Sequence, residues 1–177
     1  MQRLRLIIII CVALLGATPA AAQIAVDYQR DGVRYVRTNA EPLYDTFFNS
    51  AQYALAATVD SLGQAQWLLE VTYDEGMLHI AAGDTLQVLQ RGRKLVTLRT
   101  VAPVTRADIL RRHYIDRDDY YITARYAMTI ADIEALYSTR SLWVHVQAGD
   151  YSFDRRIYAW PTRFTRMFNA LFTRITE

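Results

Sequence analysis

The three histidines are the residues of this sequence best suited to acid–base catalysis or metal binding. His79, His113 and His145 are separated from one another by more than 30 residues, and none belongs to the His-Glu-x-x-His pattern that puts two imidazoles on one helical face. The spacing therefore predicts no zinc site. We expect His145 to pair with Asp154 across a β-hairpin, which is a structural role.

Carboxylates gather between residues 116 and 119. Asp116, Asp118 and Asp119 lie beside Arg117 and His113, and crowded carboxylates can hold a hard cation such as Ca²⁺. The segment lacks the loop glycine and the distant glutamate of an EF-hand, and its arginine is an ordinary neutralising partner. We interpret the segment as a solvated loop and predict neither a metal ion nor another cofactor.

Patterns for covalent catalysis are missing from the sequence. There is no Gly-x-Ser-x-Gly turn, and no glycine-rich loop with a following lysine. The single cysteine, Cys11, lies in an N-terminal apolar run. A hydrolase whose carboxylates or His145 meet only in the folded chain stays open as an alternative.

Arginines near the C-terminus are the candidate partner-binding residues. Arg163, Arg166 and Arg174 fall on one side of a helix at about 100° per residue. Such a patch fits an anionic partner, for example lipid headgroups, envelope polysaccharide or an acidic protein surface. The alternative is an ordinary solvated face of a helix whose other face is in the core.

The N-terminus has the pattern of a secretory signal peptide, which we place at residues 1–22. Arg3 and Arg5 precede an apolar run over residues 6–15, and small residues follow, ending at Ala22. The apolar run is too short for a membrane span, which needs roughly 20 residues. We therefore expect a chain that starts at Gln23, has no transmembrane segment and is exported to the periplasm or secreted.

The predicted exported chain has a balanced charge and no cysteine. Without residues 1–22 it has 18 basic and 18 acidic residues. This balance argues against nucleic acid as a partner, because phosphate binding needs a surplus of lysine and arginine. The lack of disulfide bonds favours a bacterial envelope over an animal extracellular space.

Residues 23–177 have the length of one domain and a mixed pattern of strands and helices. Alternation of apolar and polar residues, with glycine-containing turns, predicts strands at residues 32–38, 52–59, 66–73, 77–82, 85–90, 94–101 and 120–128. The strand at 66–73 should pair antiparallel with that at 52–59. A hairpin over residues 142–157, with Gly149 and Asp150 as its turn, would pair Val146 with Phe153 and His145 with Asp154.

Helices are predicted at three places. Thr105, with Asp108 three residues later, indicates a short helix over residues 105–112, and Thr129 begins a second helix. The third begins at about Thr162, after Pro161. Its apolar stripe has helical spacing and consists of Phe164, Met167, Phe168, Leu171, Phe172 and Ile175.

These elements predict an α+β fold: a predominantly antiparallel β-sheet with two or three helices, including the amphipathic C-terminal helix, packed on one face. For function we expect a non-catalytic, exported binding module. It would bind an envelope protein, peptide or glycan through the open face of the sheet or the arginine side of the last helix. The alternatives are the hydrolase and a structural subunit of an envelope assembly. A deep pocket holding His145 with two carboxylates would favour the hydrolase, and a shallow apolar patch would favour binding.

Overall fold

The computed structural model describes residues 24–45, 50–74, 80–105, 108–113, 118–137, 139, 142–148, 151–157 and 160–177, and strands make up most of these residues. In these ranges the strands are β1 (Ile24–Arg30), β2 (Val33–Thr38), β3 (Glu41–Asp45), β4 (Ser50–Val59), β5 (Ala65–Tyr73), β6 (Thr85–Gln90), β7 (Arg93–Thr100), β8 (Ile109–His113), β9 (Asp118–Met128), β10 (Leu142–Ala148) and β11 (Tyr151–Ile157). The helices are α2 (Ile130–Tyr137) and α3 (Trp160–Thr176). The predicted signal segment lies outside the described residues.

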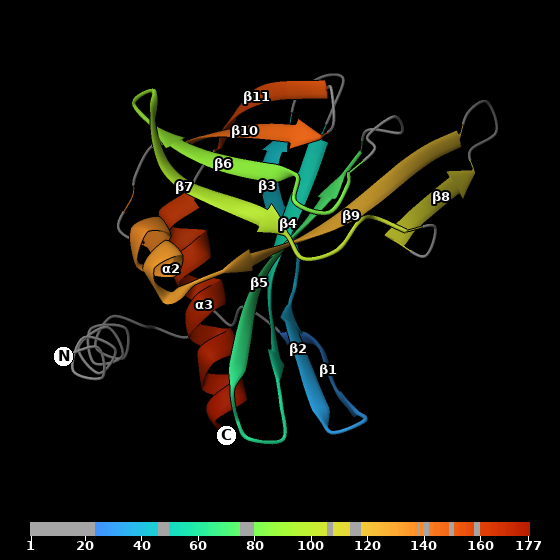
Figure 1. The fold of residues 1–177 in the computed structure, drawn as a ribbon, viewed down its shortest axis with the longest axis vertical. Helices are drawn as coiled ribbons and strands as arrows, with labels where there is room; N and C mark the ends of the chain where they lie inside the picture. Colours follow the sequence, from blue (N-terminus) through green and yellow to red (C-terminus); the bar gives the residue numbers. More distant parts are fainter. Residues whose placement is uncertain are drawn as a thin grey trace.

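One antiparallel sheet contains all of these strands (Figure 1). Its order is β1-β2-β4-β5-β9-β7-β6-β10-β11, with β3 paired to β4 and β8 paired to β9. Tight turns hold its hairpins. Asp31 and Gly32 between β1 and β2 have φ angles of 51° and 77°, and Arg91 and Gly92 between β6 and β7 have 51° and 75°. Two consecutive positive φ angles define a type I′ turn, whose twist matches that of the flanking strands.

Most predicted strands are confirmed to within two residues. The strand at 66–73 pairs antiparallel with that at 52–59, and Leu55 lies opposite Leu69. In the β10–β11 hairpin, Val146 lies opposite Phe153 and His145 lies opposite Asp154, as the sequence pattern predicts. The turn residues 149 and 150 lie outside the described residues. The α+β class holds in this form: an open, mostly antiparallel sheet that dominates the fold, with the C-terminal helix packed on it.

The predicted helix over residues 105–112 is wrong. Thr105 and Asp108 do form the expected pair, because the Thr105 amide and hydroxyl both donate to Asp108 Oδ2, at 2.9 and 2.7 Å. The chain then continues as strand β8, in which Leu110 lies opposite Tyr121 of β9. The side chains of Ile109 and Leu110 are 41% and 55% exposed, so no apolar helical face has a core to pack against at this place, and strand pairing satisfies the backbone instead.

The strand predicted at residues 77–82 is not found in the part of it that is described. Residues 77–79 lie outside the described residues, and residues 80–82 form a loop and the start of a turn. The carbonyl of Ile80 accepts a hydrogen bond from the Val104 amide at 3.0 Å, and the Ala81 amide donates to the Asp84 carboxylate at 2.8 Å. These bonds replace a strand ladder.

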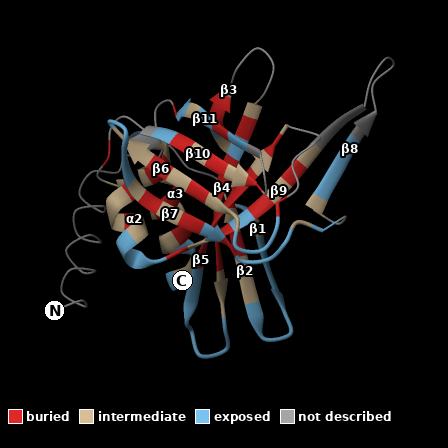
Figure 2. Ribbon diagram, turned by 45° about the horizontal axis from the view of Figure 1, so that its top comes forward, coloured by how far each residue is buried: buried red, intermediate tan, exposed pale blue. Residues whose placement is uncertain are grey.

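The core lies between the sheet and the two helices. Leu55, Leu69 and Tyr126 face it from the central strands and are at most 1% exposed. The predicted apolar stripe of α3 covers this face: Phe164, Met167, Phe168 and Leu171 are buried, and Phe172 and Ile175 are partly buried. Figure 2 shows the buried residues concentrated where the central strands cross, while the hairpin ends are exposed.

Helix α2 begins at a cap that the sequence predicts. The Thr129 amide and hydroxyl donate to Asp132 Oδ2, and the Asp132 amide donates back to the Thr129 hydroxyl at 3.2 Å. This reciprocal pair satisfies amides that the first turn of a helix leaves unpaired. Ile133 and Leu136 of α2 are then buried in the same core as α3.

The sheet curls until its far strands come together above the core. The aromatic ring of Tyr44 in β3 meets Phe153 of β11 edge-on, with 6.1 Å between ring centroids. The guanidinium of Arg155 lies 4.8 Å from the centroid of Phe153 and 5.7 Å from that of Tyr44, within cation–π range. These contacts join β3 and β11 at the edge of the core.

Replacing Phe164 by alanine should cost about 3–5 kcal/mol of unfolding free energy, because it removes a ring that is 0% exposed and leaves a cavity. Urea unfolding followed by circular dichroism measures the loss. The exposed Thr173→Ala substitution in the same helix is the control and should stay within about 0.5 kcal/mol of the parent chain. A loss below about 1 kcal/mol for Phe164→Ala would contradict this account of the core.

Candidate functional site

The candidate arginines of α3 all have carboxylate partners within the chain. Arg166 donates to Glu41 of β3, and Arg163 lies 3.7 Å from the same carboxylate. Arg163 also donates to the Pro42 carbonyl at 3.4 Å. The side chains of Arg163 and Arg166 remain 34% and 39% exposed. Both therefore connect α3 to β3 and still reach the surface.

Arg174 forms a separate cluster at the other end of α3. Its Nε donates to Asp27 Oδ2 at 2.7 Å and its Nη1 donates to Glu177 at 3.0 Å. Arg34 of β2 binds the same Asp27 with two hydrogen bonds, at 3.0 and 2.9 Å. The hydrogen bond from Arg34 is the main cause that holds the pKa of Asp27 below its usual value, and Arg174 adds to it. The three candidate arginines thus fall into two clusters. In both clusters the arginines form ion pairs that connect α3 to the sheet.

The histidine pair predicted for the last hairpin is present. His145 Nδ1 lies 2.9 Å from Asp154 Oδ1, and these side chains are 28% and 59% exposed. Residues 79 and 114–117, and the side chains of His113, Asp118 and Asp119, lie outside what the structure describes. Among the residues it does describe, no three histidine, cysteine, aspartate or glutamate side chains gather as metal ligands.

The most buried carboxylate in the described chain, Glu70 of β5, was not singled out by the sequence pattern. Its side chain is 4% exposed and binds three groups on the outer face of the sheet, the face turned away from α3. Arg37 Nε donates at 2.7 Å, Arg125 Nε at 2.9 Å and the Tyr35 hydroxyl at 2.7 Å. We call these four residues the Glu70 clamp. It joins β2, β5 and β9, because Tyr35 and Arg37 belong to β2 and Arg125 to β9.

A second carboxylate extends the clamp. Arg125 Nη1 donates to Asp108 Oδ1 at 2.7 Å, and Asp108 also accepts from Thr105. Partial burial acts to raise the pKa of Asp108, but the hydrogen bonds from Thr105 and Arg125 outweigh it and the net pKa is lowered. Burial, and then the charge of Glu70, raises the pKa of Tyr35. Tyr35 therefore stays protonated and acts as a hydrogen-bond donor at all ordinary pH values.

The Glu70 clamp is built for holding strands together. Both oxygens of the Glu70 carboxylate accept charge-assisted hydrogen bonds and the side chain is 4% exposed, so the carboxylate is poorly placed to take a proton from a substrate. The alternation of β5 places Glu70 on the polar side of the strand, but the guanidiniums that bind it come from residues 33 positions earlier and 55 positions later. Sequence spacing alone does not show such a cluster.

An open apolar groove lies between α3, the start of α2 and the β4–β5 hairpin, and has a volume of about 320 Å³. Its floor is aromatic: Trp67 stacks on Phe172 at an interplanar angle of 10° and 6.3 Å between centroids, and lies 5.2 Å from Phe168. Ile130 lines the groove and is 42% exposed, and Leu62 at the hairpin turn is 80% exposed. We call this surface the α3 groove.

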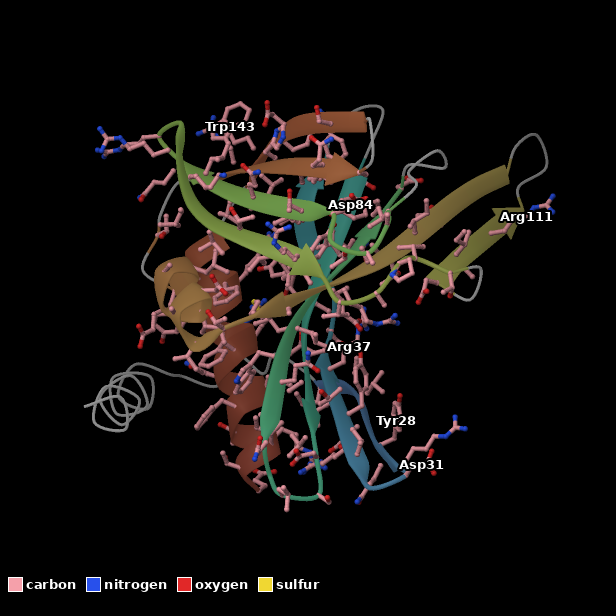
Figure 3. The ribbon with its side chains drawn as sticks, in the orientation of Figure 1. Tyr28, Asp31, Arg37, Asp84, Arg111 and Trp143 are labelled. Carbon is pink, nitrogen blue, oxygen red and sulfur yellow. The ribbon has the colours of Figure 1, made fainter. Side chains whose placement is uncertain are left out.

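A second exposed surface lies on β6, β7 and β10. Trp143 of β10 is 45% exposed and lies opposite Leu89 of β6, which lies opposite Lys94 of β7. Figure 3 shows Trp143 projecting from the end of the molecule that carries the β6–β7 hairpin. Arg91 and Arg93 flank the glycine of that turn and are exposed. We call Arg91, Arg93, Lys94 and Trp143 the β6–β7 surface.

We expect Arg37→Met to destabilise the chain by about 2–3 kcal/mol, because it removes a charge-assisted hydrogen bond from a carboxylate that is 4% exposed. The matched control is Arg34→Met on the same strand, whose partner Asp27 is 19% exposed and keeps Arg174. It should cost less than about 1 kcal/mol. Equal losses in urea unfolding would show that the Glu70 clamp is no more important than a surface ion pair.

Comparisons of the chain with known protein families, with curated proteins and with solved structures found no match. The functional interpretation therefore follows from the geometry of this chain alone.

Proposed function

We propose that this protein is a non-catalytic, exported binding module that holds an apolar segment of a partner protein in the α3 groove. The observation that carries the proposal is the apolar lining of this groove: Trp67 and Phe168 form a buried floor at 7% exposure each, and Ile130 on the wall is 42% exposed. An apolar groove of this kind gives the apolar side chains of a partner a place to leave water. Export and an envelope location belong to the proposal.

The chemistry of the α3 groove favours apolar side chains over a small polar ligand. Small-molecule sites combine apolar walls with a few convergent polar groups that fix the ligand. Here the lining hydroxyl of Thr176 already donates to the Phe172 and Thr173 carbonyls, at 3.0 Å each. A sugar or a charged metabolite would lose its hydrogen bonds to water in this groove, whereas leucine or phenylalanine side chains would gain free energy by leaving water.

The hydrolase alternative draws no support from the residues that the structure describes. His145 contacts one carboxylate, that of Asp154, on an exposed hairpin, and Asp154 is itself 59% exposed. The buried Glu70 is bound by Arg37, Arg125 and Tyr35 and does not line the α3 groove. Hydrolysis would be favoured by a deep pocket with His145 and two carboxylates. Neither the His145–Asp154 pair nor the surroundings of Glu70 has this geometry.

The test is selection of binding peptides. Residues 23–177 are immobilised and panned against a random peptide library, and the selected peptides are titrated in solution by fluorescence anisotropy. We expect the selected sequences to be rich in leucine and aromatic residues and to lose about tenfold or more in affinity with Ile130→Glu, because a carboxylate on the groove wall must be desolvated when the peptide binds.

Ile109→Glu is the matched control, because Ile109 has the same side chain and nearly the same exposure, 41% against 42% for Ile130, but lies on β8. It should leave peptide binding unchanged. If both substitutions have the same effect, or if the selected peptides are polar, the groove is not the binding site. Light scattering of the free chain tests the structural-subunit alternative, since a second copy seated in the groove would appear as a dimer that Ile130→Glu dissociates.

A further inference from the structure

The β6–β7 surface combines an exposed indole with positive charges that no carboxylate among the described residues pairs with. Across the strands, Lys94, Leu89, Trp143 and Arg156 follow one another on the outer face of the sheet. Their neighbours on the opposite side, Val88, Val96 and Val144, are buried in the core. The outer row therefore stands on a rigid support, and the indole is held in place by the strand pairing.

The cations of this surface differ from the arginines that form ion pairs elsewhere on the sheet and on α3. Arg34, Arg37, Arg125, Arg163, Arg166 and Arg174 all bind carboxylates. No carboxylate in the described part of the chain forms an ion pair with Arg91, Arg93 or Lys94. The type I′ turn at Arg91 and Gly92 carries these three cations to the end of a hairpin, where they are exposed. A concentrated positive charge of this kind attracts an anionic partner.

Hydrogen-bonding side chains occupy the next row of the same face. Gln87 of β6 lies opposite His145 of β10 and Thr97 of β7, and His145 lies opposite Asp154 of β11. His145 and Gln87 are partly exposed and Asp154 is exposed. These groups supply both donors and acceptors. A single aromatic ring beside such a row suits a sugar, which packs the apolar face of its ring on an indole and exchanges hydrogen bonds around its edge.

We propose that the β6–β7 surface binds an acidic polysaccharide: Trp143 receives a sugar ring, and Arg91, Arg93 and Lys94 pair with its carboxylates or other anionic groups. Guanidinium groups suit this task because their planar donors match a carboxylate in two parallel hydrogen bonds. The proposal is independent of the α3 groove, since the two surfaces share no residue and no strand-pairing row.

The same surface fits an anionic lipid bilayer less well. Membrane-surface binding needs several apolar side chains that enter the headgroup region beside the cations. Among the described residues of this surface, Trp143 is the one large apolar side chain that is strongly exposed. Asp154 is 59% exposed in the next row and would be repelled by anionic headgroups. In an acidic polysaccharide, hydroxyl groups lie between the anionic groups and can donate hydrogen bonds to such a carboxylate.

The test uses polygalacturonate oligomers as the acidic probe and dextran oligomers as the neutral one. Binding is followed by tryptophan fluorescence of residues 23–177, and Trp143→Phe shows whether the spectral change comes from Trp143 or from the two other tryptophans, Trp67 and Trp160. We expect saturable binding of polygalacturonate and an affinity that falls several-fold between about 50 and about 300 mM NaCl, because salt screens exposed charges. Dextran should bind at least about tenfold more weakly.

Two pairs of variants separate this surface from the rest of the molecule. Arg93→Glu with Lys94→Glu should weaken polygalacturonate binding about tenfold or more. The same change of charge made elsewhere, by Arg30→Glu with Arg111→Glu on exposed positions of β1 and β8, should have little effect. Trp143→Ala should also weaken binding about tenfold or more when binding is measured by isothermal titration calorimetry, which does not depend on the Trp143 signal, whereas Tyr28→Ala, which removes another exposed aromatic side chain, should not.

Three outcomes would overturn the proposal. Equal affinity for dextran and polygalacturonate would show that the cations do not contribute to binding. Equal effects of the two charge-reversal pairs would place binding elsewhere or make it non-specific. Binding to phosphatidylglycerol vesicles with no binding to polygalacturonate would identify a membrane as the partner. None of these outcomes affects the peptide test of the α3 groove, so the two proposals can fail separately.

Discussion

The structure depends on β5, because this strand is buried on both faces at the centre of the sheet. On the helix side, Trp67 and Leu69 pack against the core and α3. On the outer side, alternation places Glu70 where water is excluded, and a carboxylate there is stable only if other groups of the chain replace its hydration. Arg37 and Arg125 do so from opposite sides. Satisfying Glu70 therefore fixes how β2 and β9 lie relative to β5.

The same arrangement, one carboxylate bound by two arginines, recurs where α3 meets the sheet. Asp27 binds Arg34 and Arg174, and Glu41 binds Arg163 and Arg166. Each cluster joins elements that are distant in sequence, because the arginines of α3 lie more than 120 positions from their carboxylates. The apolar stripe of α3 supplies the free energy of packing, and these ion pairs orient the helix along the strands. The arginines of α3 therefore have a structural role, which is to hold the helix on the sheet.

Local patterns predicted the parts of the fold that local forces determine. The register of the β10–β11 hairpin and the buried stripe of α3 follow from alternation and helical spacing, and both are present. The pattern Thr-x-x-Asp occurs at Thr105 and at Thr129, and at both places the threonine amide and hydroxyl donate to the aspartate. The return bond differs, because the Asp132 amide donates to the Thr129 hydroxyl and the Asp108 amide donates to the Thr105 carbonyl. A helix follows Thr129 only, since Ile133 and Leu136 then reach the core. After Thr105 the next apolar residues are exposed and pair with β9, so tertiary context overrides the cap.

The candidate sites were harder to predict, because each depends on what distant segments bring together. The sequence shows Trp143 and Arg91 as separate residues 52 positions apart, and nothing in that spacing says that β6 and β10 are neighbours. The near-neutral net charge is equally uninformative, because it does not show which charged side chains form ion pairs within the chain. Carboxylates shared by two arginines hold the body of the molecule together, and Arg91, Arg93 and Lys94 are left without such a partner in the described chain. The arginines that share a carboxylate lie in the body of the molecule, and these three cations lie at one end of the sheet. We expect an anionic ligand at that end for this reason, and the net charge would not have predicted it.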